Sequence, residues 1–180
     1  PGHKFWAGIL NVTSLQPHLD DVRMLGPGAW MFQETSATKD AQRSMGTYLR
    51  LKGYILSWGA PVPGRLQGSS KLASAMKGVG GVMTMSDLRV RKMRGAWPPG
   101  LWELGRIQDT MIVVNANVQV QAVNMYGYPE SGRYPMWRQD NEKLIYFGVE
   151  RCNLSRPGPK ILCGDTNLDT LTSPMVKELL

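Results

Sequence analysis

Four short apolar runs in this sequence each stop at a polar side chain. They are residues 5–10 before Asn11, 29–33 before Glu34, 118–125 before Tyr126 and 161–164 before Asp165. Short apolar runs bounded by turn residues are typical of buried strands, and the loops at strand ends often carry chemistry. The alternative for each is an ordinary turn after a core strand. We expect the polar ends to meet at one edge of the fold.

Helical patterns separate these strands. Apolar residues recur at helical spacing between Thr38 and Lys52, and Gly53 follows as a stop signal. A second helix is predicted from Pro135 to about Arg151, and a short one after Pro17. Residues 107–114 and 118–126 predict a pair of strands around a tight connection. This mixture favours an α/β fold with sheets of mixed direction covered by helices.

The length of 180 residues, with 42% hydrophobic residues, predicts one domain spanning residues 1–180. Its apolar runs are too short to cross a bilayer, so no membrane partner is expected. Cys152 and Cys163 have no metal-ligand spacing, and Cys163 lies within an apolar strand. These cysteines favour a reduced intracellular protein, in the cytoplasm or the nucleus.

The net charge of +7 and the sequence pI near 9.6 favour a polyanionic partner such as nucleic acid. Basic residues gather in one stretch that contains a single acid, Asp87. The predicted nucleic-acid contacts are Lys71, Lys77, Arg89, Arg91, Lys92 and Arg94. A solvated hairpin face is the alternative interpretation of this stretch.

The polar strand ends have the chemistry of a metal-dependent site. Glu34 and Asp165 offer hard oxygen ligands suited to a magnesium-like ion, and a carboxylate at the end of a buried strand needs such an ion or an arginine as partner. The carboxamides of Asn11 and Asn167 and the phenol of Tyr126 can bond a phosphate or a water. Each residue alone is more often a turn former or a satisfied polar group, so the prediction depends on their common placement.

Five short segments together resemble the endonuclease/exonuclease/phosphatase superfamily, which includes exonuclease III-like and DNase I-like enzymes and the endonucleases of non-LTR retroelements. The segments are Leu10-Asn11-Val12-Thr13-Ser14-Leu15, Phe32-Gln33-Glu34-Thr35, Gly80-Gly81-Val82, Val123-Asn124-Met125-Tyr126 and Gly164-Asp165-Thr166-Asn167. The resemblance implies a four-layer α/β sandwich that hydrolyses phosphodiesters with Mg²⁺ or Mn²⁺. The family's closing Ser-Asp-His motif has no counterpart, so the chain resembles the N-terminal part of such a domain, without its last strands.

By the same resemblance, Glu34 is the main metal ligand with Asn11 beside it, and Asp165 orients or deprotonates the attacking water. Asn167 holds the phosphate and Tyr126 bonds a phosphate oxygen. The leading hypothesis is an endonuclease acting on nucleic acid, with DNA favoured over RNA. Two alternatives stay open: a catalytically incomplete remnant that binds nucleic acid through its basic surface, and a hydrolase of another phosphodiester, such as a lipid or inositol phosphate.

Overall fold

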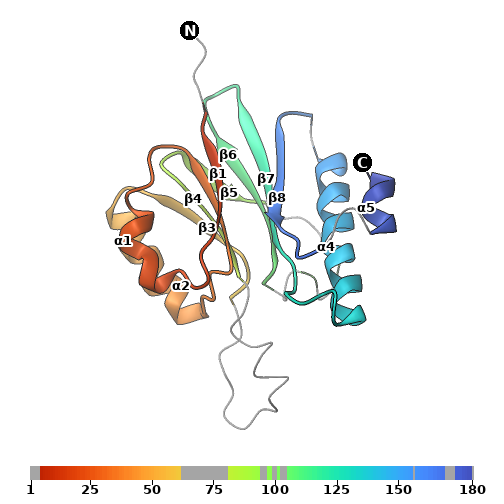
Figure 1. Cartoon of the computed structure of the whole chain (residues 1–180). Helices are drawn as coiled ribbons and strands as arrows, with labels where there is room; N and C mark the ends of the chain where they lie inside the picture. The colour runs from red at the N-terminus through yellow and green to blue at the C-terminus, as the bar shows by residue number, and fades with distance from the viewer. Residues whose placement is uncertain are drawn as a thin grey trace.

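Two four-stranded β-sheets face each other with helices on the outside, which makes a four-layer α/β sandwich (Figure 1). The computed structural model describes residues 5–61, 81–93, 97–98, 101, 105–155, 157–168 and 173–179. No helix in these described ranges is both long and apolar enough to cross a membrane. The α/β architecture with sheets of mixed direction that the sequence predicts is confirmed.

The first sheet contains β1 (Ala7–Asn11), β2 (Ala29–Gln33), β3 (Ile55–Trp58) and β4 (Val82–Ser86), in the order β1-β2-β4-β3. β1 and β2 run parallel, whereas β4 is antiparallel to both β2 and β3. β1 therefore forms one edge of this sheet, with β2 as its only neighbour among the described strands.

The second sheet contains β5 (Arg89–Lys92), β6 (Ile107–Val113), β7 (Gln119–Tyr126) and β8 (Lys160–Asp165), in sequence order. The β6–β7 hairpin is antiparallel, as its sequence predicts, and β7 and β8 run parallel. Parallel neighbours need a long crossover connection, which the helix between β7 and β8 provides.

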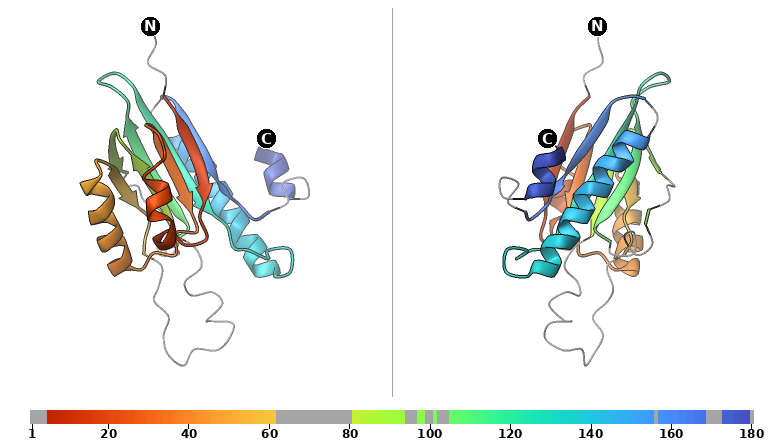
Figure 2. Two further views of the ribbon diagram at one scale, coloured as in Figure 1. Left: turned by 60° about the vertical axis from the view of Figure 1, so that its left-hand side comes forward. Right: turned by 90° about the vertical axis from the view of Figure 1, so that its right-hand side faces the viewer.

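Helices cover the outer faces of both sheets (Figure 2). The 3₁₀ turn η1 (Gln16–His18), α1 (Leu19–Val22) and α2 (Lys39–Leu51) lie against the first sheet, where Phe32 and Met83 pack on residues of these segments. α4 (Pro135–Leu154) and α5 (Pro174–Leu179) lie against the second. The predicted ends of α2 are confirmed: the Thr38 hydroxyl caps it by accepting from the Ala41 amide at 3.4 Å, and Gly53 follows at φ +90°.

Two expectations need correction. The sequence predicts β1 and β8 as buried strands, but Ile9 and Leu162 are 53% and 38% exposed. Both are edge strands, so a neighbouring strand covers only one side of each. β3 was not predicted, and β5 was covered only by the alternative interpretation of the basic stretch as a hairpin face. Cys152 and Cys163 are free thiols.

Candidate active site

The four polar strand ends lie at one edge of the sandwich. β1 and β2 are parallel, and β7 and β8 are parallel, so each pair brings two carboxyl ends together. All four strands run toward the same end of the molecule, the end that faces downward in Figure 1. Asn11 ends β1, Glu34 follows β2, Tyr126 ends β7 and Asp165 ends β8. The carboxyl ends of strands are a common place for ligands in α/β sheets.

Asn11 and Asp165 touch across the two sheets. The Asn11 Nδ2 donates to Asp165 Oδ2 at 3.2 Å, although the residues are 154 positions apart in the sequence. The Asn167 backbone N–H donates to the other Asp165 oxygen at 3.0 Å, and the Asn167 Nδ2 donates to the Gly127 carbonyl at 3.1 Å. Three of the five predicted site residues thus form one hydrogen-bonded chain, with both oxygens of the Asp165 carboxylate fixed.

Glu34 and Tyr126 join this chain electrostatically. Burial, the Glu34 carboxylate, the Asp165 carboxylate and a hydrogen bond with Glu34 raise the pKa of the Tyr126 phenol to about 12, although Arg106 acts in the opposite direction. Both carboxylates therefore face the same phenol from different sheets. Tyr126 keeps its proton at neutral pH and is a hydrogen-bond donor, not a base.

The loops after these strands contain unusual backbone conformations. Among the described residues, six non-glycine residues have positive φ, and all six follow β1, β2, β7 or β8: Thr13, Ser14, Glu34, Ser36, Glu130 and Asn167. Two of them are predicted site residues, Glu34 at φ +56° and Asn167 at φ +49°. Such conformations cost about 1–3 kcal/mol each and tend to occur at functional sites.

Two glycines bring the β7 and β8 ends unusually close. A Cβ on Gly127 would lie 2.0 Å from the Thr166 carbonyl oxygen, and one on Gly164 would lie 2.0 Å from the Met125 carbonyl oxygen. Gly164 also has φ +149°, which a side chain rarely adopts. Only glycine therefore allows the backbone before Asp165 to lie this close to β7.

Arg106 belongs to the site but was missed in the sequence. It is 3% exposed at the start of β6, and its Nη1 donates to the carbonyls of Tyr126 at 3.3 Å and Gly127 at 2.9 Å. Its guanidinium lies 3.8 Å from the Tyr128 ring centroid. Burial lowers the pKa of Arg106, and the nearby tyrosines and Glu34 partly restore it. The Glu34 carboxylate therefore interacts favourably with Arg106, although the hydrogen bonds given above are to backbone carbonyls.

The described part of the basic stretch lies away from this site. Arg89, Arg91 and Lys92 form β5, which β6 and β7 separate from β8. All three are exposed. Lys71, Lys77 and Arg94 lie outside the described residues. His18 is exposed, with its Nδ1 3.4 Å from Asp21 Oδ2, and His3 lies outside the described residues.

Several solved protein structures have a fold similar to that of this chain. The chain superposes on a 3′ phosphatase, NExo, from Neisseria bound to a product DNA hairpin, with a TM-score of 0.58 and 20% identity over 91% of this chain and 58% of that one. It also superposes on the AP endonuclease LMAP from Leishmania major, with a TM-score of 0.57 and 20% identity over 88% and 53% of the two chains. The chain has the endonuclease/exonuclease/phosphatase fold.

The same fold occurs in ANGEL2, a 2′,3′-cyclic phosphatase, with a TM-score of 0.55 and 14% identity over 89% of this chain and 45% of that one. The chain therefore spans about half the length of these three structures. No protein-family model and no curated protein sequence matches it significantly. The likeness to these structures is therefore a likeness of fold.

Proposed function

We propose that this chain is a divalent-metal-dependent phosphodiester hydrolase, and specifically an endonuclease that acts on nucleic acid. The observation that carries the proposal is the contact between Asn11 and Asp165 at 3.2 Å, beside a Tyr126 phenol that also faces Glu34. Two carboxylates, a carboxamide and a phenol thus meet at the carboxyl ends of four strands. This set has the donors and acceptors that hydrolysis of a phosphodiester needs.

The residues fit a hard divalent cation. Mg²⁺ keeps several waters and is usually held by one or two carboxylates together with substrate phosphates. Within the described ranges, no three His, Cys, Asp or Glu side chains cluster, so such an ion would have few protein ligands. Glu34 would be its main ligand with Asn11 nearby. A bound ion would polarise the phosphate and lower the pKa of a bound water.

The chain's own residues divide the remaining tasks. Asp165 is held by Asn11 and by the Asn167 amide, so its carboxylate is positioned to take a proton from the attacking water. An amide NH₂ group has two hydrogens. Asn167 can therefore hold the Gly127 carbonyl and donate to a phosphate oxygen at the same time. Tyr126, protonated at neutral pH, donates to a further phosphate oxygen.

Nucleic acid is the substrate class that the charge favours. The net charge is +7, and Arg89 and Arg91 are exposed on β5. We propose DNA rather than RNA, and the two free thiols fit a reducing compartment such as the cytoplasm or nucleus. The NExo structure contains a DNA hairpin, whereas ANGEL2 is a 2′,3′-cyclic phosphatase, so structures with this fold differ in substrate. Measuring hydrolysis of several different phosphodiesters is therefore the direct test of substrate class.

Nicking of supercoiled plasmid with and without Mg²⁺ tests the proposed activity. The assay uses the chain and a longer version that includes any residues following Leu180. We expect Glu34→Gln and Asp165→Asn to lower the nicking rate by about 100-fold or more, because each removes a charge that the proposed reaction uses at the phosphate. Asp40→Asn is the matched control, since Asp40 is an exposed carboxylate on α2 paired with Arg43.

Retained nicking in Glu34→Gln would exclude the role assigned to Glu34. If no version nicks the plasmid and all versions still bind DNA, the non-catalytic nucleic-acid-binding alternative is correct. Hydrolysis of a lipid or inositol phosphodiester without cleavage of DNA or RNA would exclude the proposed substrate.

A further inference from the structure

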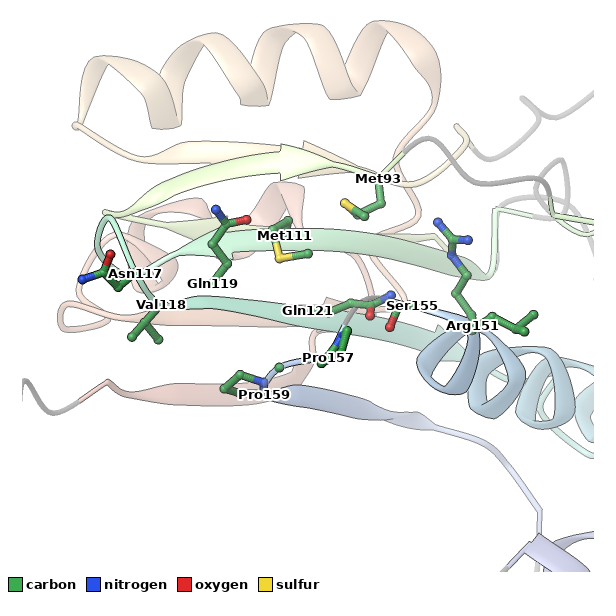
Figure 3. A pocket seen from close by; sticks show the side chains of 12 residues that line it. Met93, Met111, Asn117, Val118, Gln119, Gln121, Arg151, Ser155, Pro157 and Pro159 are labelled. Atoms are coloured by element: carbon green, nitrogen blue, oxygen red, sulfur yellow. The ribbon is translucent and has the colours of Figure 1, made fainter.

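A cavity of about 500 Å³ lies on the outer face of the second sheet. Its lining comes from the β6–β7 turn, the C-terminal end of α4 and the loop of residues 157–159 before β8 (Figure 3). The β6–β7 turn is at the opposite end of β7 from Tyr126, so the cavity is remote from the candidate active site (Figure 1). Its volume is within the range of sites for small organic ligands.

The floor of the cavity is polar and partly unsatisfied. Gln121 is 3% exposed, and its Nε2 donates to Asp109 Oδ1 at 3.0 Å. The other Asp109 oxygen accepts from Arg151 Nε at 2.5 Å. This chain fixes the Gln121 amide and leaves its carbonyl oxygen without a partner among the described residues. The hydrogen bond to Asp109 holds the Gln121 side chain in place, and its carbonyl oxygen is buried below the surface of the cavity.

The walls of the cavity are apolar and lie on both sides of Gln121. Figure 3 shows Met93 and Met111 on one side and Pro157 and Pro159 on the other. Methionine side chains are polarisable and adapt to flat ligands. The walls therefore suit a flat, largely apolar group.

The rim of the cavity is basic. Directly opposed residues of neighbouring strands have their side chains on the same face of a sheet. Arg91 opposes Met111, and Lys160 is beside Gln121, so both cations flank the cavity. Both are exposed, whereas Asp109, the acid beneath them, has a buried side chain already paired with Arg151. Neither cation forms an ion pair with another described residue, so an anionic group at the rim would meet positive charge.

We propose that this cavity binds a nucleotide unit, with its base between the methionine and proline walls and its phosphate at the Arg91–Lys160 rim. The nucleotide is either free or part of a single strand, because both present the same base and phosphate. The site extends the proposed action on nucleic acid but does not use the residues of the candidate active site.

Fluorescence anisotropy of a labelled single-stranded DNA hexamer, competed with AMP and measured without divalent cations, tests this site. Val118→Glu and Leu154→Asp each place a negative charge at lining positions that are 38% and 79% exposed, so both variants are expected to fold. We expect each to weaken binding at least about tenfold, and Arg91→Ser to weaken it about threefold to tenfold. Arg43→Ser, which removes one exposed charge on α2, is the matched control and is expected to have little effect.

If AMP competes with the hexamer, a free nucleotide is enough to fill the cavity. If the hexamer binds and AMP does not compete, the ligand is a segment of a single strand. Either result supports the site. Unchanged binding in Val118→Glu and Leu154→Asp, or equal losses in Arg91→Ser and Arg43→Ser, overturns it. Asp165→Asn separates the two proposals, because it abolishes nicking but leaves nucleotide binding at the cavity intact.

Discussion

The two halves of the interface between the sheets differ in chemistry. Toward the β6–β7 turn the facing side chains are apolar, including Ala29, Ile112 and Val120. Toward the strand ends they are hydrogen-bonded to one another. The polar half contains Gln33, Ser57, Thr84, Gln108 and Asn124, all buried.

Hydrogen bonds cross between the sheets in the polar half. Gln33 Nε2 donates to Asn124 Oδ1 at 2.6 Å, and Thr84 Oγ1 donates to Gln108 Oε1 at 3.2 Å. Three of these polar residues are one or two positions from the site: Gln33 precedes Glu34, Asn124 is two before Tyr126, and Gln108 is two after Arg106. Hydrogen bonds are directional, whereas apolar burial is not. The polar half therefore fixes how the two sheets are aligned next to the candidate site. The apolar half contributes stability without fixing this alignment.

Asn124→Leu is the strongest test of this division. Asn124 donates to the carbonyls of Phe32 at 3.0 Å and Met83 at 3.2 Å, and leucine, which is similar in size, removes both bonds and the acceptor for Gln33. We expect a loss of about 3–4 kcal/mol in the free energy of unfolding, because three buried polar groups lose partners. Urea denaturation measures the loss, and nicking at a temperature where the variant is folded measures the effect on the site.

A loss below about 1 kcal/mol with full activity would contradict a positioning role for the network. A large loss of stability with full activity in the folded fraction would show that the network stabilises the fold without fixing the site.

The Tyr126 phenol and the Cys163 thiol both have raised pKa values, but the causes differ. The pKa of each is raised to about 12, but burial is the main cause for Cys163 in the apolar half, whereas Glu34 adds to burial for Tyr126. A raised pKa means that the folded protein keeps a proton that the unfolded chain loses. The stability from Tyr126 is therefore complete below about pH 10 and is lost as the pH rises to about 12.

Unfolding free energies measured from pH 9 to 12 in wild type, Tyr126→Phe and Glu34→Gln test this difference. We expect Tyr126→Phe to remove about 1–2 kcal/mol of the alkaline loss, after allowance for solvent screening at the strand ends. Glu34→Gln should lower the pKa of Tyr126 and leave the part of the loss that comes from Cys163. Identical alkaline profiles in all three proteins would show that Glu34 and Tyr126 do not interact.

The strand ends were predictable because a polar residue after an apolar run is visible in one sequence. The positions of Asn11, Glu34, Tyr126 and Asp165 follow from this pattern. Their common placement at strand ends predicts that they meet, and the resemblance to a family supports it. The individual contacts depend on parallel pairings between distant strands, which periodicity does not show. Arg106 was missed because a single arginine before a strand usually faces solvent, and only the fold shows it under two tyrosine rings.

Composition explains the remaining misses. In β5 three of the four residues are basic, so it lacks the apolar alternation of a strand. The apolar run of β1 suggests burial, but an edge position decides its exposure. Local sequence therefore predicts which residues form strands better than it predicts which strands are covered.

Ile112→Val, a substitution in the apolar half, is expected to have the smallest effect. Ile112 is 0% exposed in the apolar half, and valine removes one methylene without introducing a polar atom. We expect a loss of about 0.5–1.5 kcal/mol in the free energy of unfolding and no change in the nicking rate of the folded protein. Because apolar contacts have no preferred direction, the neighbouring side chains can shift into the space without turning the sheets. A change in nicking rate as large as that of Asn124→Leu would mean that packing, and not the hydrogen bonds, aligns the strand ends.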